Sequence, residues 1–163
     1  MTHRFKLFNK TYESVIRQTN IDFKWIVLWD AATTRIIERP RMVNLLVVDW
    51  LSELQQYLKK DHPEGWIITS RLDNDDHIDP TFMATVQAAA TEEEAFLNIP
   101  NGRWGAKPIY HAANQFVSYV EQTRRSVYFT PHGSAMQKHA PLKQITEKRL
   151  WTTVLHERNY ING

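Results

Sequence analysis

Segments typical of β-strands alternate with helical segments through the first half of the chain, and this alternation constrains the fold most strongly. Aromatic and branched residues favour strands over residues 22–30, 45–48 and 66–72. The pattern predicts helices over residues 9–18, 52–60 and 81–91. Because helices connect parallel strands, we predict an α/β domain with a mixed, mainly parallel sheet flanked by helices, and a single domain over residues 1–163.

Residues 41–60 fit two interpretations. A helix over the whole segment would place these apolar residues at helical spacing: Val43, Val47, Trp50, Leu51, Leu54 and Leu58. A short buried strand over 45–48 followed by a helix also fits, because Ser52 and Gln55 have the spacing of a capping box. We favour the strand and the helix, since strand and helix alternate on both sides of this segment.

The second half of the chain mixes short strands, short helices and turns. We expect Asp79 to cap the helix over 81–91, with Pro80 at its first position. The remaining predicted elements are strands over 95–99 and 126–130 and short helices over 113–121 and 145–155.

The composition argues against several classes of protein. The chain contains no cysteine, which excludes disulfide bonds and cysteine-bound zinc and fits a reducing compartment, so we expect a cytoplasmic location. A net charge of +2 with scattered basic residues does not indicate a nucleic-acid partner. No apolar run approaches the ~18 residues of a membrane helix, so no membrane span is predicted.

Three carboxylates lie within four residues at the end of the clearest predicted strand, in the order Asp73-Asn74-Asp75-Asp76. Carboxylates this close repel one another unless a cation or hydrogen-bond donors compensate. A hard divalent ion is the simplest compensation, and it would also neutralise the phosphates of a nucleotide. A further acid, Asp30, ends an earlier predicted strand, and ligands of open α/β sheets bind at the carboxyl ends of strands.

Arg71 lies two residues before Asp73, so the alternation of side chains along a strand places both on one face. An arginine in a buried strand is costly to leave unpaired. We therefore expect Arg71 to contact Asp30, Asp73 or a ligand.

The acidic cluster also fits a solvated turn that precedes a helix cap. Other chemical interpretations fit less well. An EF-hand loop that began at Asp73 would need glycine and glutamate where the chain has Ile78 and Ala84. A phosphatase with an aspartyl nucleophile would have threonine or valine in place of His77, and the chain has no glycine-rich phosphate loop and no Gly-x-Ser-x-Gly motif.

Residues 68–76 resemble the Thr-x-Arg-Leu-Asp-x-Asp-Asp signature of a rhamnosyltransferase family, whose members have the GT-A type of nucleotide-sugar-binding fold. The resemblance covers essentially the whole chain and is strongest at this signature. Further similar segments lie at 14–19, 23–25 and 114–118, and these single residues follow in the family's order: Glu121, His132, Trp151, His156 and Asn159.

The resemblance implies a glycosyltransferase that uses a nucleoside diphosphate sugar and Mn²⁺ or Mg²⁺, and that transfers a sugar such as rhamnose to a glycan or other acceptor hydroxyl. Asp75, in the Asp-x-Asp (DXD) motif, would bind the metal, and His156 resembles the C-terminal metal-binding histidine of many such enzymes. Asp30, Arg71 and Asp73 would bind the nucleotide sugar. For an inverting transfer, the candidate bases are Glu92, Glu93, Glu94 and Glu121.

The first strand of the family has no counterpart before the helix over 9–18, so an N-terminally shortened GT-A-like sheet with an open edge is expected. We then expect either weak nucleotide affinity or a protein partner that covers the open edge. A non-catalytic glycosyltransferase-like binding or assembly module is therefore the alternative function. A metal-dependent phosphohydrolase is a third hypothesis.

Overall fold

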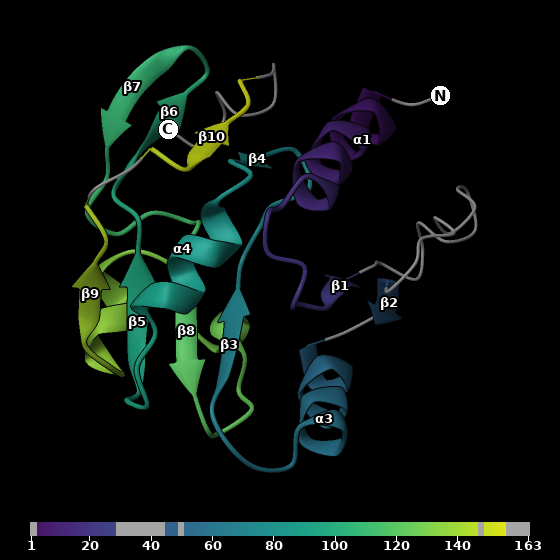
Figure 1. The fold of residues 1–163 in the computed structure, drawn as a ribbon, viewed down its shortest axis with the longest axis vertical. Helices are drawn as coiled ribbons and strands as arrows, with labels where there is room; N and C mark the ends of the chain where they lie inside the picture. The colour runs from purple at the N-terminus through teal and green to yellow at the C-terminus, as the bar shows by residue number, and fades with distance from the viewer. Residues whose placement is uncertain (1–2, 29–44, 49–50, 147–148, 156–163) are drawn as a thin grey trace.

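The computed structural model describes residues 3–28, 45–48, 51–146 and 149–155, and Figure 1 shows their arrangement. The elements of the first half are α1 (His3–Ile16), β1 (Trp25–Leu28), β2 (Leu45–Val48), α3 (Leu51–Asp61), β3 (Ile67–Ser70), β4 (His77–Ile78) and α4 (Phe82–Ala89). The second half contains β5 (Ala95–Asn98), β6 (Asn101–Trp104), β7 (Lys107–Tyr110), β8 (Ser118–Glu121), η1 (Val127–Phe129), η2 (Ser134–Lys138), β9 (Leu142–Gln144) and β10 (Trp151–Thr153).

The central sheet has the strand order β3-β8-β5-β9, and α4 lies across it (Figure 1). Strand β8 pairs antiparallel with both β3 and β5, whereas β9 pairs parallel with β5. Every residue of β5 and β8 is buried, while every residue of β3 is half-buried. The middle of this sheet is therefore formed by β5 and β8, and β3 is an edge strand.

A second sheet has the order β4-β10-β6-β7. Strand β10 pairs antiparallel with β4 and parallel with β6, so the C-terminal part of the chain lies between two earlier strands. Strands β1 and β2 form a separate parallel pair.

The α/β class is confirmed, but the mainly parallel, GT-A-like sheet is not, because both larger sheets mix parallel and antiparallel pairs. Short connections are one physical reason. Only residues 105–106 separate β6 from β7, and two residues can join antiparallel neighbours but not parallel ones.

The segment that fitted two interpretations forms a strand and a helix, β2 and α3, as we favoured. Leu54 and Leu58 are the buried residues of α3. They pack against Ile26 of β1 and Ile67 of β3. The predicted strands over 66–72 and 95–99 are also present, as β3 and β5.

Three predictions in the second half are wrong. The helix predicted over 113–121 is replaced by a loop and by β8, whose four residues are all buried between β3 and β5. The strand predicted over 126–130 is the 3₁₀ helix η1, because Arg124 and Ser126 take positive φ angles of 57° and 68° that prevent an extended chain.

The helix predicted over 145–155 is also wrong, because Trp151–Thr153 form β10 between β4 and β6. The observed starts of two helices also differ from the predicted ones. Helix α1 begins at His3 rather than near residue 9, and α4 begins at Phe82 rather than after Asp79. Asp79 still helps the chain to turn, since its Oδ1 accepts hydrogen bonds from the Thr81 amide at 3.0 Å and the Thr81 hydroxyl at 2.9 Å.

The main core joins α4 to both larger sheets. Its buried members are Val15, Ile78, Phe82, Val86, Leu97, Ile99, Phe116, Val120, Leu150 and Trp151. Trp151 stacks on Phe116 with ring centroids 4.7 Å apart, and its Nε1 donates to the carbonyl of Ile99 at 2.6 Å. This tryptophan therefore links β10 to the loop after β5.

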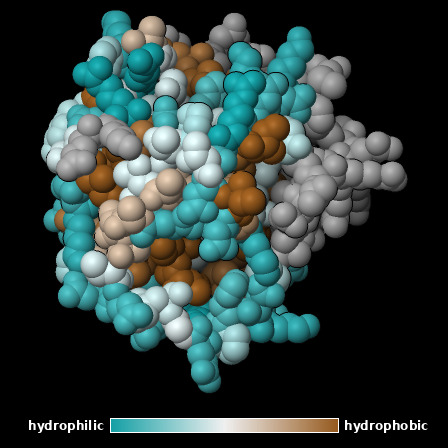
Figure 2. Space-filling model, in the orientation of Figure 1, coloured by the Kyte–Doolittle hydropathy of each residue, from teal (hydrophilic) through white to brown (hydrophobic). Residues whose placement is uncertain are grey.

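On the face seen in Figure 2, hydrophilic side chains predominate, with apolar side chains visible in patches between them. None of the helices that the structure describes is long and apolar enough to cross a membrane.

A close contact at Gly102 gives a stability prediction. A Cβ atom at this position would overlap the Trp151 ring, which is 4% exposed. We expect Gly102→Ala to lower the free energy of unfolding by about 1–3 kcal/mol in denaturant titrations, because the ring is confined. The same substitution in a Trp151→Leu background should cost much less, and an equal cost in both backgrounds would show that the clash is not its cause.

Candidate functional site

The acidic turn follows β3 at the carboxyl end of that strand. Asp73 and Asp75 are half-buried, Asn74 is exposed and Asp76 is buried. The amide of Asp76 donates to the carbonyl of Asp73 at 3.2 Å, which closes the turn. The segment predicted as a candidate site is therefore an ordered turn at the end of an edge strand.

Arg71 forms the ion pair that its position in the strand predicted. Its Nε donates to Oδ1 of Asp73 at 3.2 Å, and its guanidinium lies 5.3 Å from the centroid of the Tyr128 ring. The Arg71 amide also donates to the carbonyl of Val117 at 3.1 Å, which continues the pairing of β3 with β8. The Arg71 side chain is thus held by two partners, Asp73 and Tyr128.

Asp76 is 2% exposed and connects the turn to the C-terminal part of the chain. Its Oδ1 accepts from the Val154 amide at 3.0 Å, and its Oδ2 accepts from Nε2 of Gln115 at 3.4 Å. Burial raises the pKa of Asp76 from 3.8 to about 7, and Asp75 and Asp73 also raise it, while the Val154 amide opposes this change. Asp76 therefore serves mainly to anchor β10 to the acidic turn.

Asp30 and His156, the other two predicted site residues, lie outside the residues that the structure describes. Val154 stands two residues before His156 in the sequence, and its amide is bonded to the carboxylate next to Asp75.

Tyr128 and His132 line the site beside Arg71, and sequence reasoning gave them no role. Burial raises the pKa of Tyr128 to about 12, with Asp73 raising it further and Arg71 opposing. His132 is exposed as a whole, but partial desolvation of its ring lowers its pKa. Arg71 and His111 lower this pKa too, whereas Asp73 raises it. The lowered pKa keeps this imidazole neutral at pH 7, so one ring nitrogen is an acceptor of hydrogen bonds.

No local signal in the sequence could have found these two residues as neighbours of Arg71. The backbone at Ser126, with its positive φ, turns residues 127–132 toward the end of β3. Only the resemblance singled out His132, because this histidine occurs in the same order along the chain as in that family.

The four glutamates considered as bases lie at the opposite end of the central sheet. Ile67, the first residue of β3, pairs with Glu121, whereas Ser70, beside the acidic turn, pairs with Ser118. The residues before β5 lie at the same end as Glu121, because β5 and β3 both pair antiparallel with β8. The geometry therefore separates all four candidates from the acidic turn.

Local contacts of these glutamates agree with structural roles. Glu121 is fully buried, and its carboxylate accepts hydrogen bonds from the amides of Arg125 and Ser126 at 2.8 and 2.7 Å. Glu93 pairs with Lys143 at 2.7 Å, and Glu94 accepts a hydrogen bond from the Tyr119 hydroxyl.

The oxygen donors of the turn fit a hard divalent cation in kind. Within the described residues, no three aspartate, glutamate or histidine side chains are grouped closely enough to hold a metal ion by themselves. Asp73 is paired with Arg71, and Asp76 accepts a hydrogen bond from the Val154 amide. Asp75 is half-buried in the same turn, and it is the residue that the resemblance assigns to the metal. Any ion here would need further ligands, from a bound phosphate group or from residues that the structure does not describe.

Comparison of the chain with protein-family models, with curated proteins and with solved structures finds no match.

The contacts of Arg71 predict how its removal changes the stability of the protein and the pKa of His132. Arg71→Ala should lower the free energy of unfolding by about 1–3 kcal/mol, because Asp73 would lose its partner. It should also raise the pKa of His132, whereas Asp73→Asn should lower it further, because the two charges act on that imidazole in opposite directions. Imidazole shifts in an NMR pH titration would measure both changes.

Arg103→Ala provides a control, since Arg103 is an exposed residue of β6. Its removal should leave the His132 titration as in the wild type. If Arg71→Ala alters neither stability nor the His132 pKa, the ion pair does not organise the site.

Proposed function

We propose that the chain catalyses metal-dependent transfer of a sugar from a nucleoside diphosphate sugar to a hydroxyl group of a glycan or other acceptor. Rhamnose is the sugar that the resemblance favours. The observation that carries the proposal is the ordered acidic turn at the end of β3, where Arg71 fixes Asp73 and Asp76 anchors the chain that leads to His156.

In this proposal some residues of the turn bind the nucleotide sugar and others bind the metal. Asp73 and Arg71 bind the nucleotide sugar together with Asp30, and their mutual hydrogen bond keeps both side chains oriented before the substrate arrives. Asp75 and His156 hold Mn²⁺ or Mg²⁺, and the imidazole favours Mn²⁺ because Mg²⁺ prefers oxygen ligands. The metal, when bound, stabilises negative charge on the diphosphate leaving group.

The remaining contacts support such a role. The Arg71 guanidinium contacts both the Tyr128 ring and the Asp73 carboxylate, so two partners hold this cation in place. A fixed cation beside the acidic turn is suited to phosphate oxygens, since arginine can form two parallel hydrogen bonds with a phosphate.

A metal titration tests the proposal. We expect Asp75→Ala to weaken Mn²⁺ binding at least about tenfold when a nucleoside diphosphate is present, because the turn would lose its direct ligand. Asn74→Ala is the matched control from the same turn and should bind as the wild type does. Calorimetry with a panel of nucleoside diphosphates and their sugars would provide the measurement, and sugar transfer by the same samples would establish turnover.

The outcomes separate the two proposed ligands. Wild-type affinity in Asp75→Ala would refute the metal site. An unaffected His156→Ala, alongside a weakened Asp75→Ala, would remove His156 from the site and leave the rest of the proposal standing.

A second candidate function, a binding or assembly module, is favoured by the edges of two sheets. Strand β3 pairs only with β8, and β1 only with β2, among the strands that the structure describes. Both strands pack on α3 through Ile26 and Ile67. Strand edges of this kind can accept an extended segment of a partner through backbone hydrogen bonds.

The pairing pattern identifies which amides an incoming strand would use. The Arg71 amide bonds to Val117, so alternation along an antiparallel pair directs the Thr69 amide toward β8 and the Ile68 and Ser70 amides away from it. We predict fast hydrogen exchange at Ile68 and Ser70 and slow exchange at Thr69 and Arg71 in the isolated chain, measured by NMR. Equal protection at all four positions would mean that the edge is already covered and would count against the module.

A further inference from the structure

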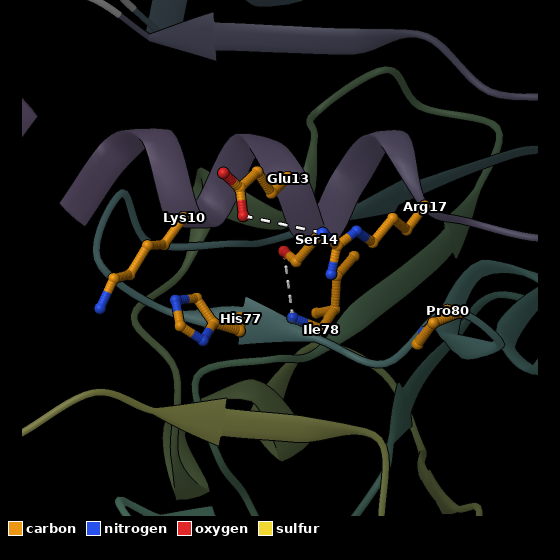
Figure 3. A pocket seen from close by; sticks show the side chains of 7 residues that line it. All are labelled: Lys10, Glu13, Ser14, Arg17, His77, Ile78 and Pro80. Carbon is orange, nitrogen blue, oxygen red and sulfur yellow. Dashed lines mark hydrogen bonds and ion pairs between the residues drawn. The ribbon is translucent and has the colours of Figure 1, made fainter. Parts of the chain in front are cut away.

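A cavity of about 300 Å³ lies between α1 and β4, on elements that the proposed sugar-transfer site does not use. Its lining includes Lys10, Glu13, Ser14 and Arg17 from α1 and His77 from β4. Figure 3 shows Lys10 extending from the helix on the side of the His77 ring, whereas the Arg17 side chain runs back along the helix toward Glu13. The volume is at the lower end of the roughly 300–1,000 Å³ that is typical of small-ligand pockets.

The helix supplies these side chains through its periodicity. Residues 10, 14 and 17 are spaced four and three apart, which places them on one face of α1. Ser14 fixes the distance between the two elements, because its Oγ donates to the Thr11 carbonyl at 2.7 Å and accepts from the Ile78 amide at 3.4 Å. Lys10 and Arg17 are exposed at their positions and so can reach a ligand in the cavity.

The His77 ring contributes a second, independent observation. Its Nε2 atom is buried and has no hydrogen-bond partner among the described residues. A buried nitrogen without a partner destabilises a protein, so a ligand atom that bonded to this nitrogen would be stabilising. The other such atom, Nη2 of Arg124, belongs to a guanidinium that already donates to the carbonyls of His62 and Gln122.

Charge indicates the kind of ligand. In this cavity Lys10 and Arg17 face one acid, Glu13, whose carboxylate is 3.9 Å from the Arg17 guanidinium. A second cavity of about 290 Å³ also contains His77 and adds Arg103 and Arg149 against one acid, Asp79. The Asp79 carboxylate is occupied by the amide and hydroxyl of Thr81. Basic side chains thus outnumber acidic ones on both sides of His77.

We propose that the cavity between α1 and β4 binds a phosphate group, with Lys10 and Arg17 as the cationic contacts and Nε2 of His77 as a hydrogen-bond donor. A tetrahedral anion with several acceptor oxygens can engage all three groups at once. Glu13 competes with the ligand for Arg17, which sets a limit on the affinity. The ligand is either inorganic phosphate or the phosphate group of a small organic molecule.

The test is an NMR titration of the full chain with inorganic phosphate, in EDTA so that no metal takes part. We expect saturable shifts of the His77 and Ile78 amides in the wild type. Lys10→Met and Arg17→Met should each weaken binding about tenfold, because each removes one charge-assisted contact. Glu13→Gln should strengthen binding several-fold, because it frees Arg17, and a purely structural role would not predict that gain.

Lys59→Met on the exposed face of α3 is the matched control and should bind as the wild type does. A parallel titration with glucose 1-phosphate distinguishes the two sources, since tighter binding than inorganic phosphate indicates an organic ligand. Absence of saturable shifts in the wild type, or wild-type affinity in both Lys10→Met and Arg17→Met, would overturn the proposal. Either result leaves the metal titration of Asp75 unaffected, so the two proposals fail independently.

Discussion

The hydrogen bond from the Val154 amide to the buried carboxylate of Asp76 is the interaction on which the arrangement of the site depends. It fastens the end of β10 to the turn after β3, although the two are 78 residues apart in sequence. Gln115 strengthens the junction, since its Nε2 also donates to Oγ1 of Thr153 at 2.8 Å. One carboxylate therefore holds together the acidic turn, the loop before β8 and the C-terminal strand.

This junction responds to pH in a definite direction. Because burial raises the pKa of Asp76 to about 7, the folded chain binds its proton more tightly than the unfolded chain does. Its contribution to stability is therefore fully present below the ordinary pKa of 3.8 and is lost as the pH rises through about 7. At neutral pH the carboxylate carries part of a negative charge beside Asp73 and Asp75, which a cation in the turn would offset.

Local sequence signals predicted the parts of the fold that local chemistry determines. The aromatic and branched residues of β1, β2 and β3 predicted these strands correctly. The contact between Arg71 and Asp73 followed from the alternation of side chains along a strand. Strand direction and partners were not predictable in the same way, because they depend on segments far apart in the chain. Trp151–Thr153 shows this well: the segment becomes a strand because β4 and β6 are on either side of it. Tyr128 joins the site only through the unusual backbone at Ser126.

The position of β10 between β4 and β6 has a consequence for how the molecule forms. Its pairing with β4 joins Thr152 to His77, so a long loop must close before either strand gains its partner. Contacts between segments so distant are typical of slow steps in folding, and they form after local helices such as α3. During synthesis, residues 73–77 leave the ribosome long before their partners in residues 151–154 exist. The candidate site can thus form only after residues 151–154 have been made, and before that Asp76 lacks the Val154 amide as a partner.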